Sequence, residues 1–298
     1  MSDRAGISLI DISTPDVTLG GIMSYSLNPG LNAMIAAGGG VVDPTFSALM
    51  TASAVVNFTS LDIATILAQT GIVGKELTTT VFYLQKFLGY GSRAGETSHT
   101  KVSLGKAFLV PRTLSAQVGG PATLTCDMIA ISADGTTAPI TVTASQTLAT
   151  GGGASAAYTA GPCSINGTSL AVASIAVDFG LDVRTEIDDA DVFPTLAYVA
   201  SRRPTITITS PDMAALATIT AIGAVQTDTD SVVYIAQLDG NSRKAGSTHI
   251  SLTVDAGRIE INSLAGSDGE PVAAEIVIKP TSDGTAAIIA VDTAVALP

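Results

Sequence analysis

The feature that most constrains this chain is an internal repeat with a period close to half of its 298 residues. The only two histidines, His99 and His249, lie 150 residues apart, and alternating apolar residues follow both. Several other segments match in the same order, which is typical of a tandem duplication. They are Val42–Phe46 with Val192–Leu196, Phe58–Asp62 with Ile208–Asp212, Tyr83 with Tyr234, Ser92–Arg93 with Ser242–Arg243, and Asp134–Thr136 with Asp283–Thr285. Tyr25–Leu27 matches Phe179–Leu181 if the first copy carries four extra residues, which we place within Ala36–Gly40.

The sequence between the two copies has the composition of a flexible linker. Gln146–Gly161 contains the run Gly151–Ala156, which consists only of glycine, alanine and serine, and such segments behave as flexible coils. The length of the chain leaves room for two domains of ordinary size. We therefore predict a first domain in residues 1–150, with an N-terminal arm and part of the linker, and a second domain in residues 151–298.

Hydrophobic periodicity predicts a mainly β (α+β) fold. Apolar residues alternate with polar or small ones over Ile175–Val183 and Thr205–Thr209, as in half-buried strands. The Asp-Gly pairs at 134–135 and 283–284 predict hairpin turns. Each copy should form a β-sandwich or rolled sheet, and the loops at 89–98 and 239–248 are long enough to reach a neighbouring subunit. Further strands are predicted at Val81–Leu84, Lys101–Val110, Thr123–Ile131, Val232–Leu238, Ile250–Ile261 and Ala274–Ile278.

One short helix is predicted in each copy. In the second copy, Ser210 can cap a helix, Pro211 suits its first position, and Asp212 favours its positive end. This helix should run to Ile222 and stop at Gly223. The first copy has Ser60 as the cap, Ile63, Ile66 and Leu67 as an apolar stripe, and Gly71 as the stop.

Composition favours a subunit of an assembly. Charged residues make up 13% of the chain, against about 25% in typical soluble domains. An isolated globule needs surface charge to stay in solution, so other subunits are expected to cover much of this surface. The alternative is a β protein of small residues with a serine and threonine surface. The net charge of −12 argues against tight DNA binding, but not against a surface that DNA passes without adhering.

The sequence predicts neither a membrane span nor a secretory signal. It has no run of about 18 apolar residues, and Met1–Ser13 carries Asp3, Arg4 and Asp11 without an apolar core. The two cysteines, Cys126 and Cys163, form no CxxC pair. Two free thiols in a reducing compartment are therefore expected.

The chain offers little chemistry, and we predict no catalytic, cofactor or metal site. A Ser-His pair needs an orienting acid and an oxyanion hole, so His99 and His249 are better explained by loop-anchoring hydrogen bonds or by inter-subunit contacts. The equivalent Arg93 and Arg243 are either solvated or in inter-subunit ion pairs. The acidic residues lack the spacing of a calcium loop and are interpreted as solvated; they are Glu186, Asp188, Asp189, Asp191, Asp228 and Asp230.

Two segments resemble the tail tube proteins of long-tailed, siphovirus-like bacteriophages. They are Asp43–Phe46, which leads into Val55–Ile63, and Ser98–Val102. The order of strand, capped helix, hairpin with a loose loop and closing strands is also similar, and the resemblance covers both copies. The family implies stacked rings, in which six domains join their inner sheets into one β-barrel around a channel. Because this chain carries two domains, the resemblance implies a trimeric ring with pseudo-sixfold symmetry.

This resemblance implies a structural virion protein with no enzymatic activity, assembled in the host cytoplasm. Its partners would be further copies of itself, other tail proteins at the tube ends, and genomic DNA that passes without specific binding. Closing a sheet across subunits removes exposed strand edges, and an acidic wall repels phosphate. If the strand at 175–183 lines the channel, Asp178 and Asp182 face it, with Ser24, Ser26 and Asn28 as the matching residues of the first copy. Arg93, His99, Arg243 and His249 are the candidate inter-subunit contacts.

Two other classes of function compete with the tail tube. Another virion or surface-shell protein, such as a decoration or S-layer-like protein, would form sheets, knobs or monomers without a channel. A hydrolytic or carbohydrate-active β-sandwich would need clustered aromatic residues or paired carboxylates in a cleft. The absence of Trp and the presence of only six Tyr argue against this third class.

Overall fold

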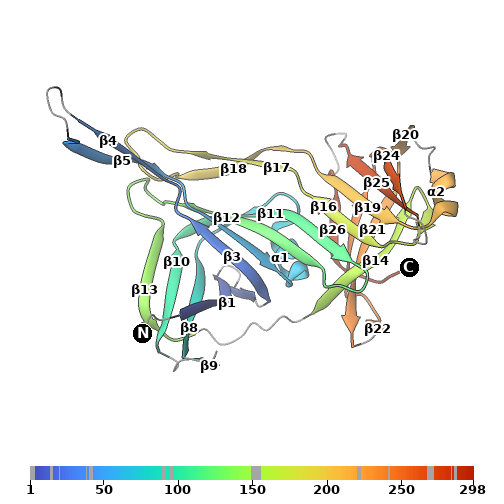
Figure 1. Ribbon diagram of the computed structural model, residues 1–298, viewed down its shortest axis with the longest axis horizontal. Coiled ribbons are helices and arrows are strands. Elements are labelled where there is room, and N and C mark those ends of the chain that lie inside the picture. The colour runs from blue at the N-terminus through green and yellow to red at the C-terminus, as the bar shows by residue number, and fades with distance from the viewer. Residues whose placement is uncertain are drawn as a thin grey trace.

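The computed structural model describes residues 4–13, 16–19, 21–37, 39, 43–88, 92–93, 97–148, 156–219, 223–240, 242–266, 272–282, 284 and 287–298. Within these ranges the chain forms 26 strands and two short helices, which confirms the predicted mainly β fold. Figure 1 shows an elongated molecule in which the first half (blue to green) and the second half (yellow to red) lie side by side.

The two halves contain the same elements in the same order. The first half consists of β1 (Arg4–Ser13), β2 (Asp16–Leu19), β3 (Ile22–Asn28), β4 (Leu31–Ala36), β5 (Phe46–Ala52), β6 (Val55–Ser60), α1 (Ile63–Thr70), β7 (Lys75–Leu77), β8 (Thr80–Leu88), β9 (Ser92–Arg93), β10 (His99–Leu104), β11 (Lys106–Gln117), β12 (Thr123–Ile131) and β13 (Ile140–Gln146). The second half consists of β14 (Ala157–Ile165), β15 (Thr168–Leu170), β16 (Ser174–Asp178), β17 (Leu181–Glu186), β18 (Leu196–Arg202), β19 (Thr205–Ser210), α2 (Met213–Ile219), β20 (Val225–Asp228), β21 (Ser231–Asp239), β22 (Ser242–Arg243), β23 (His249–Val254), β24 (Gly257–Ala265), β25 (Ala273–Pro280) and β26 (Ala290–Val295).

The strand pairing of the first half recurs in the second. For example, β12 pairs with β6 and β11, and β25 pairs with β19 and β24. A break in register recurs too, between Pro111 and Thr113 on β11 and between Ile261 and Ser263 on β24. Residues of the two halves can therefore be matched by register, and we call such matched residues counterparts. The predicted domain boundary at residue 150 lies outside the described residues and stays a prediction.

The register corrects one of the sequence matches. Tyr25 pairs with Phe58 and Ile175 pairs with Ile208, so the counterpart of Tyr25 is Ile175 and not Phe179. The loops that follow β4 and β17 are equally long, so the four extra residues expected within Ala36–Gly40 do not exist. The sequence match was wrong because alternating small and apolar residues allow the pattern to slide by an even number of positions.

The two halves share one large sheet. This ten-stranded sheet has the order β20-β24-β25-β19-β16-β11-β12-β6-β3, with β7 also paired to β11. Each half adds a six-stranded sheet, built around β8 in the first half and around β21 in the second. Tyr25 on β3 meets Phe82 on β8 edge to face, with ring centroids 5.1 Å apart, so side chains of the two sheets meet in a sandwich core.

Both predicted helices are present, but they begin later than expected. The hydroxyl oxygen of Ser60 accepts a hydrogen bond from the backbone N–H of Asp62, and Ser210 does the same for Asp212. The true cap of α2 is Asp212, because its Oδ1 accepts from the N–H of Ala215 at 3.1 Å. The serines thus shape the turn before each helix. The predicted apolar stripe of α1 is confirmed, since Ile63, Ile66 and Leu67 are buried, and Gly71 ends the helix at φ 51°. Gly223 lies beyond residues 220–222, which are outside the described residues.

Three predicted strands are interrupted. Lys101–Val110 turns at Gly105, and Ile250–Ile261 turns at 255–256. The predicted strand Ile175–Val183 breaks at Gly180, whose φ is 56° and where a Cβ would lie 2.0 Å from the carbonyl oxygen of Arg203. Gly30 repeats this arrangement at φ 57°. Only glycine tolerates this conformation and this close approach, and the bend directs β4 and β17 out of the large sheet.

The structure also corrects one predicted hairpin turn and part of the predicted linker. The Asp-Gly turn at 134–135 connects β12 to β13, which belong to different sheets, so it is no hairpin. In the predicted linker, residues 157–161 belong to β14, where Tyr158 and Ala160 are buried. Apolar partners across the sheet thus stabilise a segment whose small residues suggested flexibility.

Candidate assembly interface

The two halves join through direct strand pairing. β11 pairs antiparallel with β16, from Thr113 opposite Asp178 to Gln117 opposite Ser174. On the inner face of this junction Leu114 lies opposite Val177, and both side chains are buried. The junction therefore combines backbone hydrogen bonds with apolar packing, the two contributions that stabilise a sheet.

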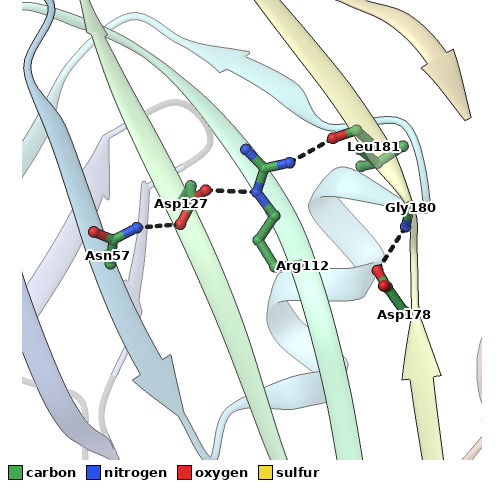
Figure 2. A network of polar contacts seen from close by, with 6 residues as sticks. All are labelled: Asn57, Arg112, Asp127, Asp178, Gly180 and Leu181. Atoms are coloured by element: carbon green, nitrogen blue, oxygen red, sulfur yellow. Dashed lines mark hydrogen bonds and ion pairs between the residues drawn. The ribbon is translucent and has the colours of Figure 1, made fainter.

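A polar network reinforces the junction on the other face (Figure 2). Arg112 lies at the register break of β11, where its Nε donates to Asp127 at 2.5 Å and its Nη1 donates to the carbonyl oxygen of Leu181 at 2.5 Å. Asn57 donates a further hydrogen bond to Asp127. Asp178 accepts from the N–H of Gly180 at 2.9 Å, which holds the bend between β16 and β17. One guanidinium thus links the first half to the bend of the second through charge-assisted hydrogen bonds.

The hairpin β17–β18 forms a second contact between the halves. In Figure 1 it extends from β16 across the first half towards β12. The carbonyl oxygen of Val192 accepts from the N–H of Ala52 at 2.9 Å, and that of Pro194 accepts from Ser132 at 2.8 Å. The N–H groups of Val192 and Phe193 both donate to the carbonyl oxygen of Gly135 at 3.0 Å. The turn of this hairpin is therefore docked on the ends of β5 and β12.

In the described residues, the counterparts of these junction strands each leave an unpaired edge in the large sheet. Among the residues that the structure describes, β3, the counterpart of β16, pairs in that sheet with β6 alone, and β24, the counterpart of β11, pairs beyond β25 with β20 alone, up to Glu260. Leu114 is fully buried, whereas its counterpart Leu264 is 43% exposed. Likewise Leu181 is 6% exposed and its counterpart Leu31 is 65% exposed. One end thus offers the surface that the other end would cover.

Four of the five predicted channel residues share one face of the large sheet. Ser24, Ser26 and Asn28 on β3 are exposed, and so is Asp178 on β16. On this polar face, the register defines a cross-strand row that begins at Ser24 and continues through Thr59, Thr125, Thr113, Asp178 and Thr205. Asp182 does not belong to this face, because it lies beyond the bend at Gly180, on β17, where Arg184 donates to it at 3.4 Å.

The predicted inter-subunit histidines lie inside the two halves. His99 and His249 are each 1% exposed. Nδ1 of His99 accepts from the N–H of Lys86 at 3.1 Å, and Nδ1 of His249 accepts from Gln237 at 2.9 Å. These contacts match the loop-anchoring alternative. They explain why both copies keep the residue, since each imidazole satisfies a backbone donor beside the loop that follows β8 or β21.

The structure also places the remaining predicted residues. Arg93 lies on β9 opposite Phe87, and Arg243 lies exposed on β22 opposite Leu238. The thiols of Cys126 and Cys163 are free and buried, and burial raises the pKa of Cys163 to about 12. In the described residues no group of three or more His, Cys, Asp or Glu side chains is arranged to hold a metal ion.

The sequence did not reveal the importance of Arg112. Its counterpart is Asn262, and the counterparts of Asp127 and Asn57 are Val277 and Thr207. The network is therefore a departure from the repeat, and this departure was the only signal available in the sequence. A residue that breaks the repeat at the junction strand marks the contact that one copy makes and the other does not.

Comparisons with known proteins do not assign this chain to a family. No protein-family model matches this chain, and a search of curated proteins finds no match. Neither α1 nor α2 is both long enough and apolar enough to cross a bilayer, and the described part of the chain contains no other helix.

Proposed function

We propose that this chain is a structural subunit of a bacteriophage tail tube, in which β24 of one copy pairs with β3 of the next. The observation that carries this proposal is the junction of β11 with β16, because their counterparts, β24 beyond Glu260 and β3, each leave an unpaired edge in the large sheet over the described residues. By register, Leu264 would lie opposite Leu27 of the next copy, as Leu114 lies opposite Val177. The interface between copies would thus repeat the interface within the chain.

Strand edges explain why such a chain assembles. An open edge is a template for pairing with another chain, and closing a sheet removes it. The two ends of this sheet are different surfaces, so the contact is head-to-tail, and a contact of this kind closes into a ring if its rotation allows. Three copies supply six repeats, the number that the resemblance to tail tube proteins implies. Stacked rings, capped by other tail proteins, would make the tube.

The polar face of the large sheet supports the role of a conduit. The row from Ser24 to Thr205 contains small hydroxyl-bearing side chains and a single carboxylate, that of Asp178. If this face lines the channel, DNA phosphates meet few cations, and the net charge of −12 disfavours adhesion. The proposed role is therefore structural, without catalysis, and its place is the virion.

Electron microscopy of the purified chain tests this proposal. The expected result is rings or tubes of uniform width with a central channel. Sheets, knobs or particles without a channel would favour a decoration or S-layer-like protein instead. A particle that stays monomeric at high protein concentration would also contradict the tail tube and is compatible with that alternative.

A further inference from the structure

The hairpins β4–β5 and β17–β18 are built alike, but over the part of the chain that the structure describes only the turn of β17–β18 is docked on the other half. The N–H of Thr45 donates to the carbonyl oxygen of Ala36 at 3.1 Å, and Thr195 donates to Glu186 at 3.0 Å. Both hairpins therefore close in the same way. While β17–β18 lies along the first half, β4–β5 projects beyond the body of the molecule at the upper left of Figure 1.

The surface that receives the docked hairpin has an uncovered counterpart. Ala52, Ser132 and Gly135 are buried beneath the turn of β17–β18, whereas their counterparts Arg202, Ser282 and Gly284 are exposed. A cavity of about 490 Å³ lies at this place, between the second half and Val73 of the first half. Its lining residues are Val73, Val199, Ala200, Ser201, Arg202, Ser282 and Ile288.

Two positions are apolar in the dock inside the chain and charged in its uncovered counterpart. Inside the chain, apolar Phe193 belongs to the turn that docks beside apolar Ala52. Their counterparts are Asp43, which is exposed, and Arg202, which is exposed. Two apolar positions of the dock inside the chain thus carry opposite charges at the uncovered place, as expected for a contact that forms between chains and must stay soluble before it forms.

The projecting hairpin also carries an unusual amount of exposed apolar surface. A protein seldom exposes so many large apolar side chains together unless another surface covers them. The residues concerned are Leu31, Met34, Ile35, Phe46, Leu49 and Met50.

We infer that the turn Asp43–Thr45 of one copy docks on a second copy, in the cavity lined by Ala200–Arg202 and Ser282 and against the backbone of Gly284. The N–H of Asp43 would donate to the carbonyl oxygen of Gly284, as Phe193 does to Gly135, and the Asp43 carboxylate would meet the Arg202 guanidinium. This inference rests on the head-to-tail assembly proposed above, and it adds an arm that links neighbours outside the strand pairing.

Cysteine crosslinking of the full chain tests the inference. The variant carries Asp43→Cys and Arg202→Cys, and a short bis-maleimide is added to assembled protein. Cys126 and Cys163 are 0% and 1% exposed, so they should not react. The matched control carries Ala52→Cys and Phe193→Cys and is treated with a mild oxidant instead, because position 52 is 3% exposed and a disulfide within one chain needs no room for a crosslinker. Each single variant serves as a further control.

The docked arm predicts covalent oligomers of the double variant on a denaturing gel, and none from the single variants. Rings seen by microscopy without covalent oligomers, while the control pair reacts, would overturn the docking and leave the tube proposal intact. Covalent oligomers without rings would support the docking and contradict ring closure. If neither appears, both proposals fail.

Charge reversal gives a second readout. Arg202→Asp should weaken assembly at least about tenfold, which corresponds to about 1.4 kcal/mol, and adding Asp43→Arg should restore it. If the double reversal assembles no better than Arg202→Asp alone, the two side chains do not meet.

Discussion

Replacing Leu264 by alanine should weaken assembly while leaving each chain folded. Leu264 is 43% exposed in the single chain, and its counterpart Leu114 is fully buried at the junction of β11 with β16. Pairing of β24 with β3 of the next copy would bury the exposed part of Leu264 against Leu27. The leucine side chain therefore contributes to assembly, because it gains its last apolar contacts only there.

The expected magnitude follows from the exposed fraction. Burying a whole leucine side chain contributes about 1.5–3 kcal/mol, so burying the remaining 43% contributes about 0.6–1.3 kcal/mol for each junction. A ring of three junctions would lose about 2–4 kcal/mol. Since about 1.4 kcal/mol is a factor of ten, the equilibrium constant for ring formation should fall by about 30-fold to 700-fold.

Sedimentation over a range of protein concentrations measures this constant for the natural chain and for Leu264→Ala. The matched control is Leu114→Ala, which should cost about 2–5 kcal/mol of folding stability and change assembly little once the chain is folded. The reasoning is refuted if Leu264→Ala assembles like the natural chain, or if it acts only by lowering the free energy of unfolding.

Three further predictions concern folding stability, measured by urea denaturation of the single chain. Arg112→Ala should lower the free energy of unfolding by about 1.5–3 kcal/mol, because charged hydrogen bonds to Asp127 and Leu181 are lost. The control Lys279→Gln, at the exposed Lys279–Glu260 pair, should lower it by less than about 1 kcal/mol. Equal losses in the two variants would contradict the role given to the Arg112 network. His249→Phe should cost about 1–3 kcal/mol, because it leaves the N–H of Gln237 without its acceptor, and an unchanged midpoint would show that this bond is dispensable. Burial raises the pKa of Asp228, although the hydrogen bond from the Ser231 hydroxyl opposes this shift. The folded chain therefore holds the Asp228 proton more tightly than the unfolded chain does. As a result, the free energy of unfolding falls as pH rises through the pKa of the folded state. Asp228→Asn should therefore raise stability at pH 7 and flatten its decline above about pH 4, and a less stable variant at pH 7 would contradict this sign.

The repeat made much of the fold predictable, because its signal is spread over many residues. The segment Thr123–Ile131, for example, consists mostly of β-branched and apolar residues, and β12 has the predicted bounds. The bend at Gly180 was not predictable, because the alternation of apolar residues continues through it from Ile175 to Val183. Local pattern does not report a turn that depends on a close contact with Arg203.

The assembly interface was harder to predict from sequence. Leu114 and Leu264 fit the same repeat, but sequence does not tell which of them is covered, because that depends on which strand lies beyond β11. The histidines attracted attention as rare residues, and they act inside each half. Sequence reasoning did not single out Arg112, since a single arginine in a strand has no local signature and its partner Leu181 lies 69 residues along the chain.

The mass of the isolated assembly, measured by native mass spectrometry, tests the central claim most directly. Pairing of β24 with β3 around a closed ring of six repeats predicts a particle of about 90 kDa, three times the 29.9 kDa chain. A particle that remains at the mass of one chain at high concentration, or a ring of six chains, would contradict it.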